Sequence, residues 1–305
     1  MTHLRKGDTA PAIGVKHRKV FGLPVDHGIM FSNYKQRYKP RVEKRQRMLI
    51  IKIPFLRPFL EPGETLILTT TGYSPATALD KLGIGLFFIY LKRSLLVFTD
   101  RRLFHIPTTP IYRYRNSIAQ IPYTCCESIQ IKGRKLVVNY KNGEGTEKFF
   151  GVSGREKKKI RELLKTISFD GKSVGTARRV HLCPQCGALL PLWVPECRKC
   201  KLKFKTGTIA TALAILFPWG GYYYLRQPFL GTITALIEIF AGALIGVSVY
   251  DLLSGVPANL VWLGGGILLL ALVKVFAVAH ARVIVAEFIP RQKTITFQTV
   301  TALPH

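Results

Sequence analysis

The stretch that decides how this chain is organised lies past its middle: Cys183-Pro184-Gln185-Cys186-Gly187, then Cys197-Arg198-Lys199-Cys200. It places four cysteines in two Cys-x-x-Cys pairs, with ten residues between the pairs. Each pair can fold as a tight knuckle, and two knuckles can share one tetrahedral zinc ion. Two disulfides are the alternative pairing, and iron is the main competitor for a four-thiolate site. We therefore predict a small zinc module over residues 182–205, with four ligands: Cys183, Cys186, Cys197 and Cys200.

The first knuckle resembles the zinc-ribbon knuckles found beside membrane segments in many prokaryotic proteins. Cys183, Pro184, Cys186 and Gly187 match that pattern. The second knuckle departs from it, because Lys201 stands where a glycine often sits. The resemblance implies a structural metal site next to a membrane.

The charge balance indicates an anionic partner. The 305-residue chain has 45 Lys and Arg against 17 Asp and Glu, a formal net charge of +28. Nucleic acid and the anionic cytoplasmic leaflet of a membrane are the two candidates. Because the chain becomes almost continuously apolar from Thr208 to Ala279, we favour the membrane leaflet.

Residues 1–47 are basic, carry scattered Pro and Gly, and show no sustained periodicity. We predict an extended or disordered segment there. Basic and aromatic residues alternate in its last part, a composition that can bind phosphates and stack rings on RNA or at lipid headgroups. A solvated tail is the alternative interpretation. The candidate anion-binding residues are Lys35, Arg37, Lys39 and Arg41.

Residues 48–168 alternate short apolar runs with turn residues, which is typical of a mostly β domain. The sequence predicts a helix over Arg155–Ile167, with an apolar stripe and a capping box at Ser153 and Glu156. A small barrel or sandwich with this helix at one end follows. The seven predicted strands are Thr65–Thr71, Gly83–Tyr90, Ser94–Phe98, Arg101–Ile106, Glu127–Ile131, Lys135–Tyr140 and Thr146–Phe150.

This order of elements resembles the pleckstrin-homology-like superfold, in particular its bacterial and GRAM-like branches. The residues that carry the resemblance are Pro62-Gly63-Glu64, the hairpin Leu95–Phe104 and the closing helix. It implies a module that binds lipid headgroups, peptides or neighbouring subunits, and no catalysis. Exposed hairpin charges are the alternative to a phosphate-binding role for four residues here: Lys92, Arg93, Arg101 and Arg102.

A linker over 169–181 and the zinc module lead into three apolar stretches within 206–288: Thr208–Leu225, Phe229–Tyr250 and Asn259–Ala279. Residues 289–305 form a C-terminal tail. The first two stretches resemble the hairpin of the TM2 family, with Tyr222 at a position that is normally polar. We expect three spans. Two spans, with the first stretch lying in the interface, would keep all basic residues on one side.

The basic block before these stretches orients the N-terminal domains toward the cytoplasm, in an integral protein of the inner or plasma membrane. Its lysines are further candidates for contact with anionic lipid: Lys199, Lys201, Lys203 and Lys205. Within the apolar stretches we predict that Glu238 and Lys274 pair between antiparallel helices, helped by Gly242, Gly246 and the glycines from Gly264. The alternative is that Lys274 reaches the interface alone.

The sequence contains no phosphate-cradling glycine loop, no nucleophile elbow and no His-Glu-x-x-His motif. We therefore expect a binding protein and not an enzyme. The first hypothesis is a membrane-anchored adaptor that engages anionic lipid or a protein partner. The alternatives are a membrane-tethered nucleic-acid binder and an accessory subunit of a transport or secretion complex.

Overall fold

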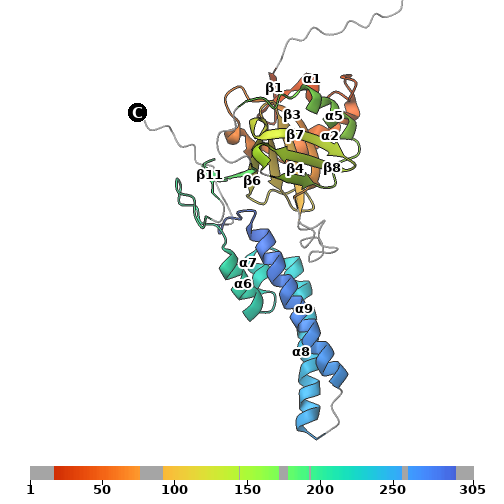
Figure 1. The fold of residues 1–305 in the computed structure, drawn as a ribbon, viewed down its shortest axis with the longest axis vertical. Helices are drawn as coiled ribbons and strands as arrows, with labels where there is room; N and C mark the ends of the chain where they lie inside the picture. Colours follow the sequence, from red (N-terminus) through yellow and green to blue (C-terminus); the bar gives the residue numbers. More distant parts are fainter. Residues whose placement is uncertain are drawn as a thin grey trace, which may run out of the picture.

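The structure is a computed structural model that describes residues 17–75, 92–143, 145–171, 178–191, 194–255 and 260–292. A β-rich domain lies at one end, and a bundle of helices extends from it along the long axis (Figure 1). The metal module lies between the two parts. The predicted division into a mostly β region, a four-cysteine cluster and apolar C-terminal helices is confirmed at this level.

Four consecutive strands form the antiparallel centre of the main sheet: β3 (Leu66–Tyr73), β4 (Arg93–Thr99), β5 (Arg102–Pro107) and β6 (Ile118–Pro122). Apolar and β-branched residues fill these strands, in keeping with a sheet that is covered on both faces. The sequence prediction missed β6. The predicted strand Gly83–Tyr90 lies outside the described residues.

A second antiparallel sheet packs across the first: β7 (Cys126–Lys132), β8 (Lys135–Tyr140) and β9 (Thr146–Phe149). Short 3-10 turns, η3 (Tyr123–Cys125) and η4 (Lys141–Gly143), flank its first two strands. One isolated bridge, between Tyr73 and Phe150, joins the two sheets at a corner. The sheets do not close into a continuous barrel, so the architecture is a sandwich-like pair of sheets.

Helix α5 (Lys157–Thr166) covers the core between the sheets with Ile160, Leu163 and Leu164. The predicted helix is therefore present, but the predicted capping box is wrong. Ser153 Oγ accepts a hydrogen bond from Arg45, and the Glu156 carboxylate binds Arg45 and Thr70. These tertiary partners occupy the side chains that a local capping box would need.

Residues 17–47 are folded, so the prediction of a disordered segment is wrong for this range; residues 1–16 lie outside the described part of the chain. The segment forms β1 (His17–Val20), β2 (Leu23–Asp26), α1 (His27–Met30) and α2 (Pro40–Ile50), followed by η1 (Pro54–Phe59). Its apolar side chains cover the outer face of the main sheet. The buried contributors are Val20, Leu23, Val25, Met30 and Phe31.

Polar contacts fix this covering segment in place. Gln46 is buried and exchanges two hydrogen bonds with the Thr69 backbone, as an additional strand would. Lys159 of α5 donates to the carbonyls of Met30 and Ser32, at 2.7 Å each. Leu66, Leu95 and Val97 project from the outer face of the sheet. Burying these apolar side chains under the N-terminal segment is favourable, because exposure of apolar surface to water costs free energy.

The helical part contains α6 (Gly207–Leu216), α7 (Gly220–Tyr224), α8 (Pro228–Leu253) and α9 (Leu260–Val285). Only α8 and α9, of 26 residues each, are long and apolar enough to span a membrane among the described helices. At 1.5 Å per residue each measures about 39 Å, against about 30 Å of hydrocarbon. The described helices thus provide two possible spans, and not the three that we expected.

The first apolar stretch is broken at Pro218 and Trp219, where Trp219 adopts a positive φ of 54°. Helix α6 then measures only about 15 Å, and α7 folds back against it, with Gly221 close to Ala210 and Ala214. In this part of the chain α6 and α7 form a short helical hairpin, where the TM2 resemblance implied the first of two spans.

Two short strands attach the metal module to the main sheet. The strand β10 (Val180–Leu182) pairs with β6, and β11 (Leu189–Leu190) pairs with β10. The expected linker 169–181 therefore ends inside the sheet; its residues 172–177 lie outside the described range. On the other side, Phe204 bridges to Pro290 just after α9.

Candidate metal centre

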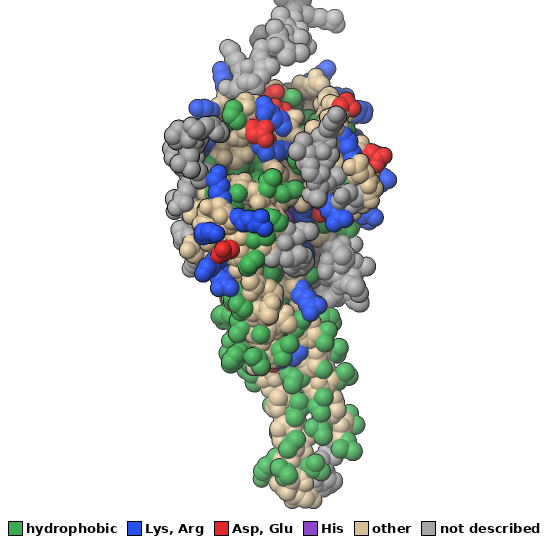
Figure 2. Space-filling model, turned by 60° about the vertical axis from the view of Figure 1, so that its left-hand side comes forward, with side chains coloured by type: hydrophobic (Ala, Val, Ile, Leu, Met, Phe, Trp, Pro, Cys, Tyr) green, Lys and Arg blue, Asp and Glu red, His purple; other side chains and the backbone are tan. Residues whose placement is uncertain are grey.

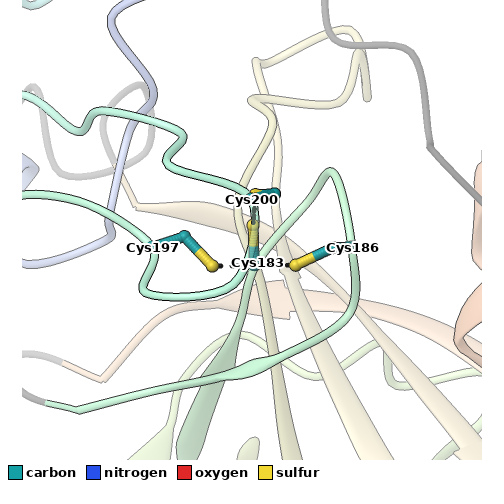
Figure 3. A group of neighbouring side chains, drawn as sticks. All are labelled: Cys183, Cys186, Cys197 and Cys200. Atoms are coloured by element: carbon teal, nitrogen blue, oxygen red, sulfur yellow. Dashed lines mark hydrogen bonds between the residues drawn. The ribbon is translucent and has the colours of Figure 1, made fainter. Parts of the chain in front are cut away.

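The four predicted ligand cysteines come together in one cluster. Their Sγ atoms all lie within 4.8 Å of one another and point toward a common centre (Figure 3). Cys183 Sγ is 3.5 Å from Cys200 Sγ, and Cys186 Sγ is 3.6 Å from Cys197 Sγ. Zinc–thiolate bonds of about 2.3 Å in a tetrahedron place sulfurs about 3.8 Å apart. The cysteines are free, and the cluster has the geometry of a four-coordinate metal site.

The two knuckles have the same backbone geometry. Gly187 N donates to Cys183 O and Lys201 N donates to Cys197 O, each at 2.8 Å. In the same way Cys183 N donates to Ala188 O, and Cys197 N donates to Leu202 O. Gly187 has φ 71° and Lys201 has φ 59°, so the lysine adopts the left-handed conformation that the glycine provides in the first knuckle.

The thiols are held in surroundings that differ between the knuckles. Burial raises the pKa of Cys183, and it raises the pKa of Cys186 to about 11. Burial also opposes ionisation of Cys197, but backbone hydrogen bonds from Cys200 and Lys199 outweigh it and lower that pKa. A bound cation would favour the thiolate form at all four positions, because metal binding displaces thiol protons.

The cluster joins three parts of the molecule. Its first knuckle continues strand β10 of the main sheet. Its second knuckle leads into Phe204 and Lys205, whose backbones meet Pro290 and Ile289 after α9. Leu190, Leu202 and Phe288 pack against the cysteines as a small core. The metal centre is thus part of the junction between the β-rich domain and the helices.

The basic residues predicted to bind anions do not form one surface. All four residues of the first group are exposed: Lys35, Arg37 and Lys39 follow α1, and Arg41 lies at the start of α2. These two helices lie on the part of the domain farthest from α8 and α9 (Figure 1). Contact between this group and the membrane that α8 and α9 would span therefore has no support from the fold.

The hairpin cations are mostly engaged within the domain. Arg102 is buried and donates to both carboxylate oxygens of Glu64, at 3.0 and 2.6 Å, and to Gln120. Burial opposes ionisation of Glu64, but the Arg102 hydrogen bonds outweigh it and lower the pKa of Glu64. Arg102 is therefore a structural residue, and its predicted anion-binding role is wrong. Arg101, by contrast, is half-exposed and pairs with Glu61 on the surface.

Lys92 and Arg93 differ in their surroundings. Lys92 is buried. Arg93 lies partly buried against the Tyr112 ring, 4.4 Å from its centroid, and also donates to the Tyr112 hydroxyl. Lys92 is thus inaccessible to a lipid surface, and Arg93 is fixed in place by Tyr112.

The lysines in and after the second knuckle lie at the base of the domain. Lys199, Lys201 and Lys203 are exposed, whereas Lys205 is buried against Tyr224, and burial lowers the pKa of Lys205 to about 8. Lys and Arg side chains lie over the domain and its base, above helices covered by hydrophobic side chains (Figure 2).

The predicted pair within the apolar helices is present. Lys274 Nζ lies 2.9 Å from Glu238 Oε2. It also donates to Ala214 O, in the last turn of α6, at 3.1 Å. The predicted glycine contacts are only partly right: a Cβ on Gly266 would meet Ile245 and Ala241, but Gly242, Gly246 and Gly264 have no neighbour within 4 Å at that position.

Sequence reasoning missed a buried polar cluster where the domain meets the end of α9. Arg179 donates to His105 Nδ1 and pairs with Glu147 and Glu287. His105 Nε2 lies 2.8 Å from Ser74 Oγ. This Ser–His pair lacks the carboxylate that orients a catalytic base, since an arginine occupies Nδ1. Burial and Arg179 lower the pKa of His105 well below its usual range. The cluster joins five segments that are distant in sequence, and no local sequence motif predicts it.

No protein-family model, no curated protein and no solved structure matches this chain.

Proposed function

We propose that this protein is a membrane-anchored adaptor whose β-rich domain and metal module lie on the cytoplasmic face. In this proposal α8 and α9 are the two spans, zinc occupies the four-cysteine site, and the domain binds anionic lipid or a protein partner without catalysing a reaction. The observation that carries it is the junction, where the metal knuckles connect the main sheet to both ends of the helical part.

The position of the basic residues supports the orientation. Phe204, before the helices, bridges to Pro290, after them, so the chain enters and leaves the anchor on one side. Arg226 donates to Arg291 O at the same junction. With two spans, every basic cluster lies on the domain side, as the positive-inside rule requires. Three spans would instead place the basic residues after α9 on the opposite side of the membrane, against that rule.

The chemistry of the cysteine cluster supports zinc as the ion. Four thiolates at tetrahedral spacing, with backbone N–H groups directed at sulfur, are typical of closed structural zinc sites. Iron suits the same donors, and colour would distinguish it. A closed site of this kind stabilises structure, and in this chain it would hold the domain in a defined orientation on its anchor.

The order of elements supports the resemblance to pleckstrin-homology-like domains. A four-stranded meander, a three-stranded meander and a closing helix follow one another, although the sheets are not closed. Domains of that superfold bind lipid headgroups, peptides or subunits, which is consistent with an adaptor.

Tag accessibility in sealed membrane vesicles tests the anchor. A tag at either terminus should be digested from the cytoplasmic side, and a tag between α8 and α9 only from the other side. The protein should also resist alkaline extraction. A C-terminal tag on the side opposite the N-terminal tag would overturn the two-span arrangement.

A membrane-tethered nucleic-acid binder is the second candidate. It is favoured by the exposed segment with Tyr34, Lys35, Arg37 and Tyr38, which lies on the part of the domain away from the anchor. Aromatic and basic residues in this mixture suit single-stranded nucleic acid. Full-length protein in neutral nanodiscs should bind anionic vesicles more tightly than single-stranded RNA if the adaptor proposal holds. Tighter, salt-dependent RNA binding would favour the second candidate.

A further inference from the structure

We propose that a concavity at the open corner of the two sheets is a phosphate-binding site. The concavity has a volume of about 440 Å³. Its cationic lining comes from three separate elements: Arg93 at the start of β4, Arg134 in the turn between β7 and β8, and Arg155 in the segment between β9 and α5. Neither Arg134 nor Arg155 was a candidate from the sequence. The proposal deepens the adaptor function, on which its lipid form rests, by naming the site and the ligand chemistry.

The wall of the concavity is built from backbone and small polar groups. Gly151, Ser153 and Gly154 line it beside Tyr73. Gly151 has φ 65°, and a Cβ there would lie 2.3 Å from the Tyr73 ring, so only glycine lets the chain pass this close. The Val152 N–H donates to Arg134 O at 3.0 Å, which fixes the Arg134 turn against the wall. The rim is therefore held by the fold.

The described residues that line the concavity have a net positive charge. None of the described residues that line it is acidic. The neighbouring carboxylate, Glu156, is buried behind the wall and paired with Arg45 and Thr70. Arg93 is positioned by Tyr112, while Arg134 and Arg155 are exposed at the other rim.

Three arginines from separate elements suit a phosphate group better than a carboxylate. A phosphate monoester presents three acceptor oxygens and nearly two negative charges, and arginine forks bind such oxygens in pairs. The volume falls in the range of small-ligand sites. We therefore assign the site to a ligand that carries a phosphate monoester.

The rim of the concavity is next in sequence to residues that line a cavity with the segment after α9. Tyr73 and Arg93 are adjacent in sequence to Ser74 and Lys92, which share a small cavity with Glu287 just after α9. A phosphate at a membrane surface and a soluble phosphate compound are two sources of the same chemistry, and the experiment separates them.

The test uses the full chain in phosphatidylcholine nanodiscs and titrates pyrophosphate by calorimetry. Arg134→Gln and Arg155→Gln should each weaken binding about tenfold or more, the typical effect of losing one charge-assisted contact. Arg161→Gln is the matched control, since Arg161 is an exposed arginine of α5 that does not line the concavity. It should leave the dissociation constant within about twofold, a change too small for a lost contact. Equal losses in all three variants, or no binding of pyrophosphate, would overturn the site.

A second arm identifies the source of the phosphate. Phosphatidic acid in the same nanodisc should compete with pyrophosphate if a lipid headgroup is the ligand, and phosphatidylglycerol, a diester, should compete less. Undiminished pyrophosphate binding in both lipids assigns the site to a soluble phosphate compound. If the membrane anchor is wrong, the protein will be extracted from membranes while it still binds pyrophosphate. If the phosphate site is wrong, the protein will stay in the membrane but will not bind pyrophosphate.

Discussion

At the residue scale, Lys201 adopts a strained, left-handed backbone conformation that is unusual for a lysine. A non-glycine residue in the left-handed region costs roughly 1–2 kcal/mol, and Lys201 has φ 59° so that its N–H can close the second knuckle on Cys197. Gly187 occupies the equivalent position without that cost. The two positions therefore form a natural pair for substitution.

We expect Lys201→Gly to stabilise the metal centre by about 0.5–1 kcal/mol, because glycine relieves the strain but is more flexible when unfolded. Gly187→Ala should destabilise it by about 1–2 kcal/mol for the converse reason. The rate of metal release to a chelator measures both changes. Faster release from Lys201→Gly would contradict the expectation.

Arg102 and Arg101 show how neighbouring cations can have opposite roles. Arg102 is buried with Glu64, whereas Arg101 pairs with Glu61 at the surface. Removing one partner of a buried pair costs about 3–5 kcal/mol, because the other charge stays buried and unpaired. We expect Arg102→Met to lower the free energy of unfolding of the β-rich domain by that amount, measured by urea denaturation. The matched Arg101→Met variant should change it little, and a large loss there would contradict the assignment.

At the element scale, the ion pair in the helical part does more than join two helices. Lys274 binds Glu238 and also the carbonyl of Ala214 at the end of α6. A cation at a helix C-terminus is favourable, so the pair also fixes the short hairpin of α6 and α7 against α8 and α9. Deleting either charge leaves the other unpaired.

A double-mutant cycle of Glu238→Gln and Lys274→Met should show coupling of at least about 0.6 kcal/mol, the mean for polar contacts between membrane helices. The melting temperature in detergent provides the measurement. Asp251→Asn, which changes an acid near the end of α8, is the control. Additive effects would show that Glu238 and Lys274 act separately.

The N-terminal elements are a cover for the sheet and not a tail. Within residues 17–47, five apolar side chains are buried: Val20, Leu23, Val25, Met30 and Phe31. Burial of each contributes up to about 1.5–3 kcal/mol. We expect deletion of residues 1–47 to cause aggregation and dye binding to the bared sheet, whereas deletion of residues 1–16 alone should not. A monodisperse protein that begins at residue 48 would contradict this.

At the scale of the whole molecule, the four-cysteine cluster lies at the junction between the β-rich domain and the long apolar helices. The first knuckle follows the sheet edge at β10, and the chain after the second knuckle bridges to the segment after α9. Loss of the ion should therefore loosen the junction while the sheets, with their own core, stay folded.

We expect one zinc ion per chain by metal analysis of protein purified without chelators. Cys186→Ser should lose that ion and increase tryptic cleavage between residues 196 and 206, where lysines follow the second knuckle. Cys126→Ser is the control, since Cys126 lies in the sheet core, away from the cluster. Absence of zinc, or a coloured iron-containing preparation, would contradict the assignment.

Patterns that are local in sequence predicted the features that depend on neighbouring residues. Cysteine spacing identified the four ligands, alternation identified most strands, and apolar length identified the two long helices. The ionisable side chains of Glu238 and Lys274, in two apolar stretches expected to be antiparallel helices, were enough to predict their pairing. Each of these features depends on a local period in the sequence or on two segments joined by a short connection.

Only the tertiary structure decided which surfaces are covered and which charges are buried. The sequence did not reveal that residues 17–47 cover the sheet, because their apolar residues follow no single period. Arg102 differs from Arg101 because it is buried against Glu64, 38 residues away in sequence, and against Gln120. The fold-back at Pro218 likewise depends on packing of α7 against α6. Long-range contacts decide these features, since burial depends on which distant segments meet and not on the residue itself.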